Sequence, residues 1–368
     1  MMRQWTTLMD GIDKLKLQQV PQPQELKSDE VLVKISRVAL NYRDSQLISG
    51  AFKGRYAAPE SPLVPCSDAA GTIAAVGPAG TAPETTKWQV GQRVLGLVRP
   101  THSTGPTRAK HHASGLGIPG PGVLAEYHVF AAGGLLRVPD YMSLDEACTL
   151  PIASVTAWMA LNWDRQIGSP RSEPQTTVLI QGTGGVAIAA LQQAHALGLR
   201  TIVTSSSDAK LQRAKELGAD HAVNYSTTPE WADEVLRLTD GKGADIIVET
   251  GGPGTMEQSL RAVSEGGNIS AVGILTAGSS SDDSETNKSQ TSSVGLQLIG
   301  RNAAIKGINI GPKDRTEEML AFYADHRLHP QVGKTFAFED AAAALESLKS
   351  GDHFGKVVIA INHFRGRK

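Results

Sequence analysis

The feature that most constrains the fold of this chain is an apolar run followed by closely spaced glycines. Residues 177–181 lead into Gly182, Gly184 and Ala187, in the spacing G-x-G-x-x-G/A. Gly182 permits a tight turn, Gly184 lets the backbone approach a pyrophosphate, and Ala187 lets the following helix lie close to the strand. The N–H groups at the start of such a helix favour phosphate oxygens. The run therefore predicts dinucleotide binding by Gly182, Thr183, Gly184, Gly185 and Val186.

A lone glycine motif is weak evidence, and its surroundings give it meaning. After residue 150, short apolar runs alternate with helical segments of roughly ten residues. We expect strands at 176–181, 200–204, 221–225, 244–249, 268–272 and 304–308, and helices at 185–197, 208–217, 229–238 and 255–263. This alternation is typical of βαβ units, so the fold class is predicted to be α/β with a doubly wound parallel sheet.

The first 150 residues have a different pattern, with strands expected at 31–40, 69–76, 92–98 and 124–130 and little helical periodicity before Leu144. We interpret them as a mostly β domain. Residues 100–122 are predicted to form a long surface loop, and residues 278–295 a solvated loop. Past Gly311 we expect helices at 317–326 and 340–349 and a strand at 356–361.

Composition excludes several classes of protein. With 36 basic and 37 acidic residues, the net charge of −1 argues against a nucleic-acid or anionic-membrane binder. Cys66 and Cys148 are the only cysteines, too few for a disulfide framework or a four-cysteine zinc site. The start has no signal-peptide core, and no apolar run approaches about 18 residues. We expect a cytoplasmic protein with a small-molecule partner.

Cofactor choice depends on the end of the second strand of the nucleotide domain. Ser205, Ser206 and Lys210 stand there, and no acid lies at the strand tip. Hydroxyls and an ammonium favour the 2′-phosphate of NADP(H), whereas an acid would bind the ribose of NAD. Asp208 is the rival ribose ligand, but as the expected helix N-cap its carboxylate would serve backbone N–H groups.

Further stretches resemble one known family, the medium-chain dehydrogenase/reductase superfamily, over essentially the whole chain. They are residues 65–73, 90–94, 150–151 with 156–158, 214–220 and 353–358. The resemblance implies a GroES-like catalytic domain at 1–150, a Rossmann domain that binds NADP(H) at 151–311, and a return of 312–368 to the first domain. It also implies an active site in the cleft between the domains.

The same resemblance raises the question of zinc. Zinc alcohol dehydrogenases carry a Cys early in the first domain and a Gly-His-Glu, and here the corresponding residues are 41–44 and 66–68, where both the Cys and the His ligand are missing. A zinc site needs three or four converging ligands. His111 and His112 are adjacent, and we interpret them as surface histidines. The chain therefore resembles the zinc-free branch, which includes quinone oxidoreductases, enoyl reductases and zinc-less alcohol dehydrogenase-like proteins.

In that branch an Asn-x-x-Asp motif lies near the nicotinamide, which implies catalytic roles for Asn41, Tyr42 and Asp44. The Asn41 amide would hydrogen-bond a substrate carbonyl or the nicotinamide, or else satisfy backbone at a strand end. Tyr42 would donate a proton or be a buried aromatic residue. The resemblance further implies cofactor contacts from Thr156, Tyr225, Thr250, Gly251, Gly273, Ile274, Leu275 and Lys356.

Together these observations predict a zinc-independent, NADPH-dependent oxidoreductase that transfers hydride to an activated C=C bond of an enone- or quinone-type substrate. Alcohol or carbonyl oxidoreduction is the alternative enzyme activity. A non-catalytic NADPH-binding redox sensor is the alternative from another class. A homodimer is expected.

Overall fold

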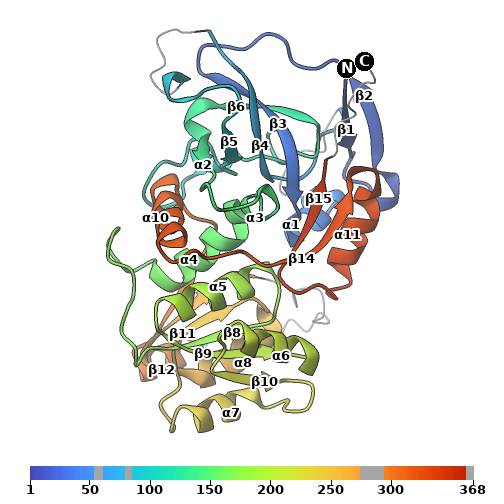
Figure 1. Cartoon of the computed structure of the whole chain (residues 1–368). Coiled ribbons are helices and arrows are strands. Elements are labelled where there is room, and N and C mark those ends of the chain that lie inside the picture. The colour runs from blue at the N-terminus through green and yellow to red at the C-terminus, as the bar shows by residue number, and fades with distance from the viewer. Residues whose placement is uncertain (54–60, 79–84, 274–293, 362–368) are drawn as a thin grey trace. The chain divides into compact units, whose positions relative to one another are not determined.

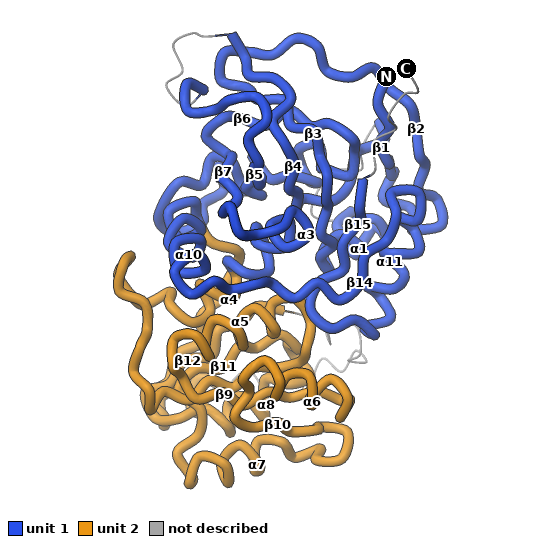
Figure 2. The backbone as a smooth tube through the Cα atoms, in the orientation of Figure 1, with its two compact units in different colours: residues 1–155, 312–368 blue, residues 156–311 orange. Residues whose placement is uncertain are grey.

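A computed structural model describes residues 1–53, 61–78, 85–273 and 294–361 of the 368-residue chain. Ile274 and Leu275 lie outside the described residues, as does most of the expected loop over 278–295. The chain divides into two compact units (Figure 2). Unit 1 comprises residues 1–155 and 312–368, and unit 2 comprises residues 156–311, whereas the sequence predicts boundaries after residues 150 and 311.

Unit 2 contains the predicted doubly wound parallel sheet. Its six strands have the order β10-β9-β8-β11-β12-β13, and all neighbours are parallel. The strands are β8 (Thr177–Gln181), β9 (Arg200–Ser205), β10 (His221–Asn224), β11 (Ala244–Glu249), β12 (Val263–Ala271) and β13 (Ala304–Gly307). The chain order reverses between β8 and β11, and ligands of such sheets bind at the carboxyl ends of the strands at this point.

The helices of unit 2 follow the predicted alternation with strands (Figure 1). The four predicted helices are α5 (Gly185–Ala196), α6 (Asp208–Glu216), α7 (Trp231–Leu238) and α8 (Pro253–Ala262). Two further helices, α4 (Val155–Asn162) and one over residues 294–301, are not among those predicted. Helices α5 and α6 contact β8, β9 and β10, whereas α7 and α8 pack on each other and contact β10, β11 and β12. A shared core takes buried side chains from five strands, among them Leu179, Ile202, Val223, Ile247 and Ile269.

Unit 1 is built on a second sheet of order β14-β15-β3-β4-β5-β7, with β6 also paired to β3. Its strands are β3 (Glu30–Ala39), β4 (Asp68–Val76), β5 (Arg93–Gly96), β6 (Tyr127–Ala131), β7 (Leu135–Arg137), β14 (Val332–Ala337) and β15 (Lys356–Ala360). A separate antiparallel pair joins β1 (Met2–Thr6) to β2 (Lys16–Val20). Strand β15 runs antiparallel to β3, so the C-terminal segment completes the first unit.

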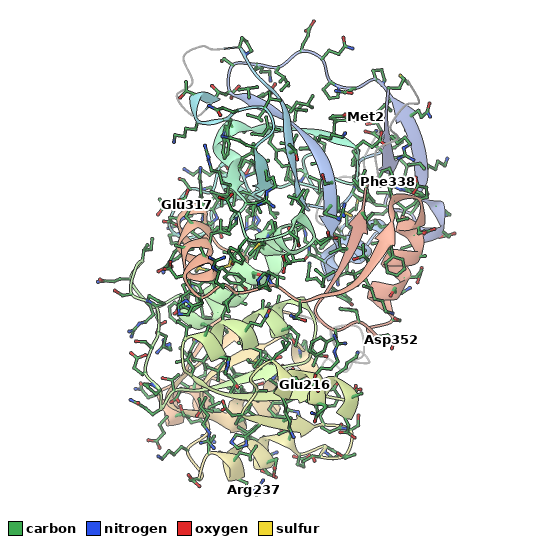
Figure 3. The ribbon with its side chains drawn as sticks, viewed as in Figure 1. Met2, Glu216, Arg237, Glu317, Phe338 and Asp352 are labelled. Atoms are coloured by element: carbon green, nitrogen blue, oxygen red, sulfur yellow. The ribbon has the colours of Figure 1, made fainter. Side chains whose placement is uncertain are left out.

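Unit 1 also contains helices, and the first and the last of them contribute buried side chains to its core. They are α1 (Tyr42–Ile48), α2 (Ala109–His112), α3 (Leu144–Ala147), α10 (Lys313–Asp325) and α11 (Ala341–Lys349). Phe338, labelled in Figure 3, precedes α11 and is 1% exposed, and its carbonyl accepts a 2.8 Å hydrogen bond from the Trp5 indole. Among the described helices, none is both long and apolar enough to cross a lipid bilayer.

The segment over 100–122 departs from its prediction as a surface loop. It contains α2, and His111 is buried there, with its ring stacked on that of buried His102 at a centroid distance of 4.2 Å. The interpretation of His111 as a surface histidine is therefore wrong. The backbone N–H of Arg108 donates to His111 Nδ1 (3.1 Å), which holds the ring inward.

Candidate functional site

The glycine turn lies where β8 ends and α5 begins. Gly182 has φ +78°, a conformation that L side chains rarely adopt, and its N–H donates to the carbonyl of Thr204 at 2.8 Å. Gly184 is the N-cap of α5, so no side chain caps the helix, and the first turn holds no acidic residue. Thr183 is buried, and Gly185 and Val186 open the helix. Uncapped N–H groups at a helix start suit a phosphate.

The ends of β11 and β12 lie beside this turn. A Cβ built on Gly273 would lie 2.2 Å from the carbonyl oxygen of Thr250, so only glycine allows this approach. The Thr250 hydroxyl donates to the carbonyl of Gln181 at 3.0 Å. A Cβ on Gly182 would lie 3.9 Å from that hydroxyl oxygen. The structure thus brings together Gly182, Thr250, Gly251 and Gly273 at the carboxyl edge of the sheet.

The residues predicted to determine the preference for NADP(H) over NAD lie around the end of β9. Ser205 is buried and Ser206 is exposed. The backbone N–H of Tyr225 donates to the carbonyl of Ser205 at 3.1 Å, which places Tyr225, 43% exposed, beside the tip. Lys210 lies half-buried in the first turn of α6. Four of the predicted cofactor contacts therefore lie around one strand end.

The N-cap of α6 differs from its prediction. Ser207 is the N-cap, because its hydroxyl accepts the N–H of Lys210 at 3.4 Å, and the expectation that Asp208 is the N-cap is wrong by one residue. Asp208 is exposed, and its carboxylate accepts a 2.7 Å hydrogen bond from Asn224 Nδ2 at the end of β10. The rival ribose ligand is thus tied to the neighbouring strand.

Thr156 is the first residue of unit 2 and lies in the first turn of α4. It is 3% exposed. The hydroxyl of Ser270 donates to the carbonyl of Ala160 at 2.7 Å, so α4 is attached to β12, the strand that leads to Gly273. The predicted contact of Thr156 with the nicotinamide stays a prediction.

In unit 1, Asn41 lies between β3 and α1 and is the N-cap of α1. The carboxylate of Asp44 accepts the backbone N–H of Asn41 at 2.8 Å, and the N–H of Asp44 donates to the carbonyl of Asn41 at 2.8 Å. Burial raises the pKa of Asp44. These bonds give Asp44 the geometry of a residue that positions the backbone of Asn41.

The side chain of Asn41 is held by two titratable residues from neighbouring strands, Lys356 and Asp68. Its Oδ1 accepts a hydrogen bond from the Lys356 ammonium at 2.7 Å, and its Nδ2 donates to Asp68 Oδ2 at 2.9 Å. The same ammonium donates to the carbonyl of Leu40 at 2.6 Å and lies 3.7 Å from Asp68 Oδ2. Lys356, predicted to contact the cofactor, is buried within unit 1 and directs its ammonium to Asn41.

Asp68 is the residue of this network that sequence reasoning missed as a functional group. It is completely buried, and among the described residues its Oδ1 has no hydrogen-bond partner. Burial raises its pKa to about 7, although the Lys356 ammonium and the Asn41 hydrogen bond both act to lower it. A signal exists in the sequence, because Asp68 belongs to the 65–73 stretch that resembles the family and to residues 66–68, which correspond to a zinc-ligand segment of zinc alcohol dehydrogenases.

Tyr42 follows Asn41 in the chain, and Cys66 lies two residues before Asp68. Tyr42 is 40% exposed, so the alternative of a buried aromatic residue is wrong and the side chain is accessible to solvent. Cys66 is completely buried, and burial raises the pKa of its thiol well above the ordinary value. A thiol that stays protonated is a poor nucleophile.

Comparisons with known proteins agree with this architecture. Residues 27–140 match the family model of the alcohol dehydrogenase GroES-like domain, and residues 185–325 match that of the zinc-binding dehydrogenase. A zinc-type alcohol dehydrogenase-like protein of Schizosaccharomyces pombe is 38% identical over 96% of this chain and 97% of its own. A quinone oxidoreductase of Pseudomonas aeruginosa is 29% identical over 92% and 93%. The crystal structure of an NAD-dependent alcohol dehydrogenase superposes with a TM-score of 0.81 at 31% identity, covering 98% of this chain and 100% of that one.

The residues near Asn41 do not fit a zinc ion, although one matching model is named for zinc. Among the described residues, no three or more His, Cys, Asp or Glu side chains converge as a metal site. The Asn41 amide oxygen already accepts from an ammonium. A cation at this place would compete with Lys356 for the same acceptors.

Proposed function

The chain belongs to the medium-chain dehydrogenase/reductase superfamily, and from that premise we propose that it is a zinc-independent oxidoreductase that uses NADPH to reduce an activated C=C bond. The substrate class is an α,β-unsaturated ketone or a quinone. The quinone oxidoreductase relative supports this substrate class. The carboxyl edge of the unit 2 sheet supports a nicotinamide dinucleotide as cofactor, because a glycine turn and an uncapped helix start lie there together.

Each part of the carboxyl edge suits one part of the cofactor. The turn at Gly182–Gly184 and the start of α5 would hold the pyrophosphate. The hydroxyl of exposed Ser206 and the ammonium of Lys210 would hold the 2′-phosphate of NADPH. Because one relative is described as NAD-dependent, the preference for NADPH over NADH is tested by titration of both cofactors. When bound, NADPH supplies a hydride to the carbon conjugated with the substrate carbonyl.

The observation that carries the zinc-independent part of the proposal is the Lys356–Asn41 contact. An ammonium 2.7 Å from Asn41 Oδ1 fixes which end of the amide accepts and which end donates. The Nδ2 group has two N–H bonds, and one of them is used on Asp68. The other N–H is the group that we assign to the substrate carbonyl oxygen.

Two side chains of this protein then stabilise the negative charge that develops and supply the proton that the product takes up. As hydride adds to the β-carbon, the electron pair of the C=C bond moves toward the carbonyl oxygen and forms an enolate. The Asn41 N–H stabilises that negative charge without titrating. The exposed Tyr42 hydroxyl, or water, donates the proton that the α-carbon takes up.

Alcohol and carbonyl oxidoreduction is the second candidate, favoured by the names of two relatives. Without a Lewis acid, a carbonyl substrate needs a strong proton donor at its oxygen. The accessible Tyr42 is the residue that would supply it.

A turnover screen tests the proposal. The purified chain is mixed with NADPH or NADH and with panels of enones, quinones and aldehydes, and products are identified by mass spectrometry. Saturated ketones or hydroquinones formed with NADPH support the proposed function. Turnover of aldehydes alone moves the assignment to the second candidate. Tight NADPH binding with no turnover on any panel identifies a redox sensor and overturns the enzyme assignment.

We also propose a cytoplasmic homodimer that acts on a small molecule and has no nucleic-acid or membrane partner. β13 is an edge strand of the unit 2 sheet. Just before it in the chain, the helix over 294–301 exposes Leu296 and Ile299, at 71% and 78%. Exposed apolar side chains and an open strand edge each favour self-association. Sedimentation of the wild type against Ile299→Glu measures this, and a monomeric wild type contradicts it.

A further inference from the structure

A buried carboxylate joins the two turns of the candidate cofactor site. Glu249 is the last residue of β11 and is 0% exposed. Pairing between β11 and β8 ends at Val248 and Ile180, so Glu249 and Gln181 lie one step beyond the last pair. The two side chains meet where the turns at Gly182 and Gly251 begin.

Both oxygens of the Glu249 carboxylate are used. Oε1 accepts from the N–H groups of Gly251 (2.9 Å) and Gly252 (3.0 Å) and from the Thr255 hydroxyl (2.6 Å). Oε2 accepts from Gln181 Nε2 (2.7 Å) and from the Ser259 hydroxyl. A buried charge is costly unless it is hydrogen-bonded, and this one is bonded to the turn itself.

Gln181 has only one orientation that fits these partners. Its Oε1 accepts from the N–H of Thr250 at 3.2 Å, and its Nε2 donates to Glu249 and to Ser259. If the amide were reversed, its Nε2 would face the N–H of Thr250, and two donors would meet. The polarity of the pair is therefore set from both sides.

The turn at residues 250–252, which these hydrogen bonds hold, is tightly packed. A Cβ built on Gly251 would lie 2.3 Å from the Thr255 hydroxyl oxygen. Gly252 has φ +88° and is the N-cap of α8. Gly273 packs against the carbonyl of Thr250 from the next strand. Two features therefore fix the backbone of residues 250–252. Close packing leaves no room for a Cβ at Gly251 or Gly273, and the Glu249 carboxylate accepts hydrogen bonds from the backbone N–H groups of Gly251 and Gly252.

We propose that Glu249 is a positioning residue for the dinucleotide, which holds the 250–252 turn and, through Gln181, the 182–184 turn in their binding geometry before the cofactor arrives. This inference rests on the proposed function, because it takes the dinucleotide as the ligand of these turns. Glu249 acts through the turns and touches no reacting atom.

The same two strands provide a matched control at their other end. Asp245 accepts the backbone N–H of Thr177 at 2.7 Å and the Ser264 hydroxyl at 3.2 Å. It therefore also joins β11 to β8 by a carboxylate, but at the start of the strands, away from the turns. Asp245→Asn therefore measures how weakening a carboxylate contact between β11 and β8 affects the sheet when the turns are left intact.

The decisive variant exchanges the pair. Glu249→Gln sets two amide groups against each other, and Gln181→Glu sets two carboxylates against each other. In Gln181→Glu/Glu249→Gln, the amide introduced at position 249 donates to the carboxylate introduced at position 181 and still accepts from Gly251 and Gly252. That carboxylate in turn accepts from Thr250 and Ser259. Every donor regains an acceptor, with the polarity reversed.

Binding of NADPH to each full-length variant is measured by titration, and amide hydrogen exchange is measured on the same proteins without cofactor. We expect each single variant to bind NADPH at least about tenfold more weakly, and the exchanged pair to return to within about threefold of the wild type. Exchange should rise at Gly251 and Gly252 in Glu249→Gln but not in Asp245→Asn. Thr255→Val against Thr255→Ser repeats the comparison with a milder loss if Glu249→Gln does not fold.

The results separate the possible failures. Equal NADPH affinity in wild type and Glu249→Gln overturns the inference, as does an affinity loss in Asp245→Asn as large as that in Glu249→Gln. An exchanged pair that stays as weak as the single variants also overturns it. If the wild type binds neither NADPH nor NADH, the proposed function fails, and hydrogen exchange alone then decides whether Glu249 holds the turns.

Discussion

The ammonium of Lys356 lies 2.7 Å from Oδ1 of Asn41, across 315 residues of sequence. Lys356 opens β15 and Asn41 follows β3, and these strands are antiparallel neighbours in one sheet. The contact orients the Asn41 amide, because a reversed amide would set its N–H groups against the ammonium. At the other end of the amide, Asn41 Nδ2 donates a hydrogen bond to Asp68 Oδ2, on the neighbouring strand β4.

The first prediction isolates the Asn41 N–H donor. In Asn41→Asp/Asp68→Asn, the carboxylate introduced at position 41 accepts from Lys356 and from the amide introduced at position 68. The network is thus rebuilt with reversed polarity and the same charge. Position 41 then has no side-chain N–H for the substrate. We expect kcat/KM to fall by about 10²–10³ while the melting temperature stays close to that of the wild type.

Two single variants are the controls. Asp68→Asn keeps the Asn41 donor and should keep most of the activity. Asn41→Ala should lose activity and also about 1–3 kcal/mol of stability, because Lys356 and Asp68 lose buried partners. If the double variant turned over like the wild type, Asn41 would be a structural residue.

The second prediction concerns the pH dependence of stability. Burial raises the pKa of Asp68 from 3.8 to about 7, so the folded chain keeps a proton that the unfolded chain has already lost. The Asp68 contribution to the free energy of unfolding therefore decreases as pH rises from 3.8 to about 7 and is constant above that range. Urea unfolding at about pH 5 and about pH 8 should show this decrease in the wild type and a smaller one in Asp68→Asn. An unchanged difference in Asp68→Asn would assign the pH dependence to other groups.

The third prediction concerns cofactor preference. Lys210→Ala removes an ammonium at the β9 tip, and a charge-assisted hydrogen bond contributes about 1.5–3 kcal/mol, or roughly 10–150-fold in affinity. We expect NADPH binding to weaken by up to this factor and NADH binding to change little, because NADH has no 2′-phosphate. Titration of both cofactors measures the difference.

Lys215→Ala, at an exposed position of the same helix α6, is the matched control and should change neither affinity. Equal dissociation constants of the wild type for NADPH and NADH would contradict the preference. A Lys210→Ala variant that weakened both cofactors alike would make Lys210 a structural charge and Asp208 the leading ribose ligand.

The fourth prediction concerns metal. Because the Lys356 ammonium already donates to Asn41 Oδ1, and no three or more His, Cys, Asp or Glu side chains of the described residues converge, we expect no tightly bound zinc and no loss of activity after dialysis against a strong chelator. Elemental analysis and activity before and after dialysis provide the measurement. Stoichiometric zinc together with activity lost to the chelator and restored by zinc would refute it.

The parts of this protein that local sequence could predict are those whose interactions are local. The strand, glycine turn and helix at β8 and α5 are contiguous, so spacing alone predicts them. Strands β8, β9 and β11 are short and almost wholly buried, because both faces of a parallel sheet are covered at its centre. By contrast, β2 and β14 consist mostly of exposed or half-buried residues, and their pattern did not indicate strands.

The α/β fold and the position of the glycine turn therefore follow from the order of residues alone, since each depends on neighbours along the chain. The partners of Asn41 and of Glu249 follow only from the folded arrangement. Asn41 follows β3, whereas Asp68 and Lys356 open β4 and β15. Strand order and register, which long-range packing sets, bring the three residues together. Glu249 meets Gln181 for the same reason, because β11 pairs with β8 across 68 residues. Which polar groups share a buried space depends on this pairing, and no local pattern encodes it.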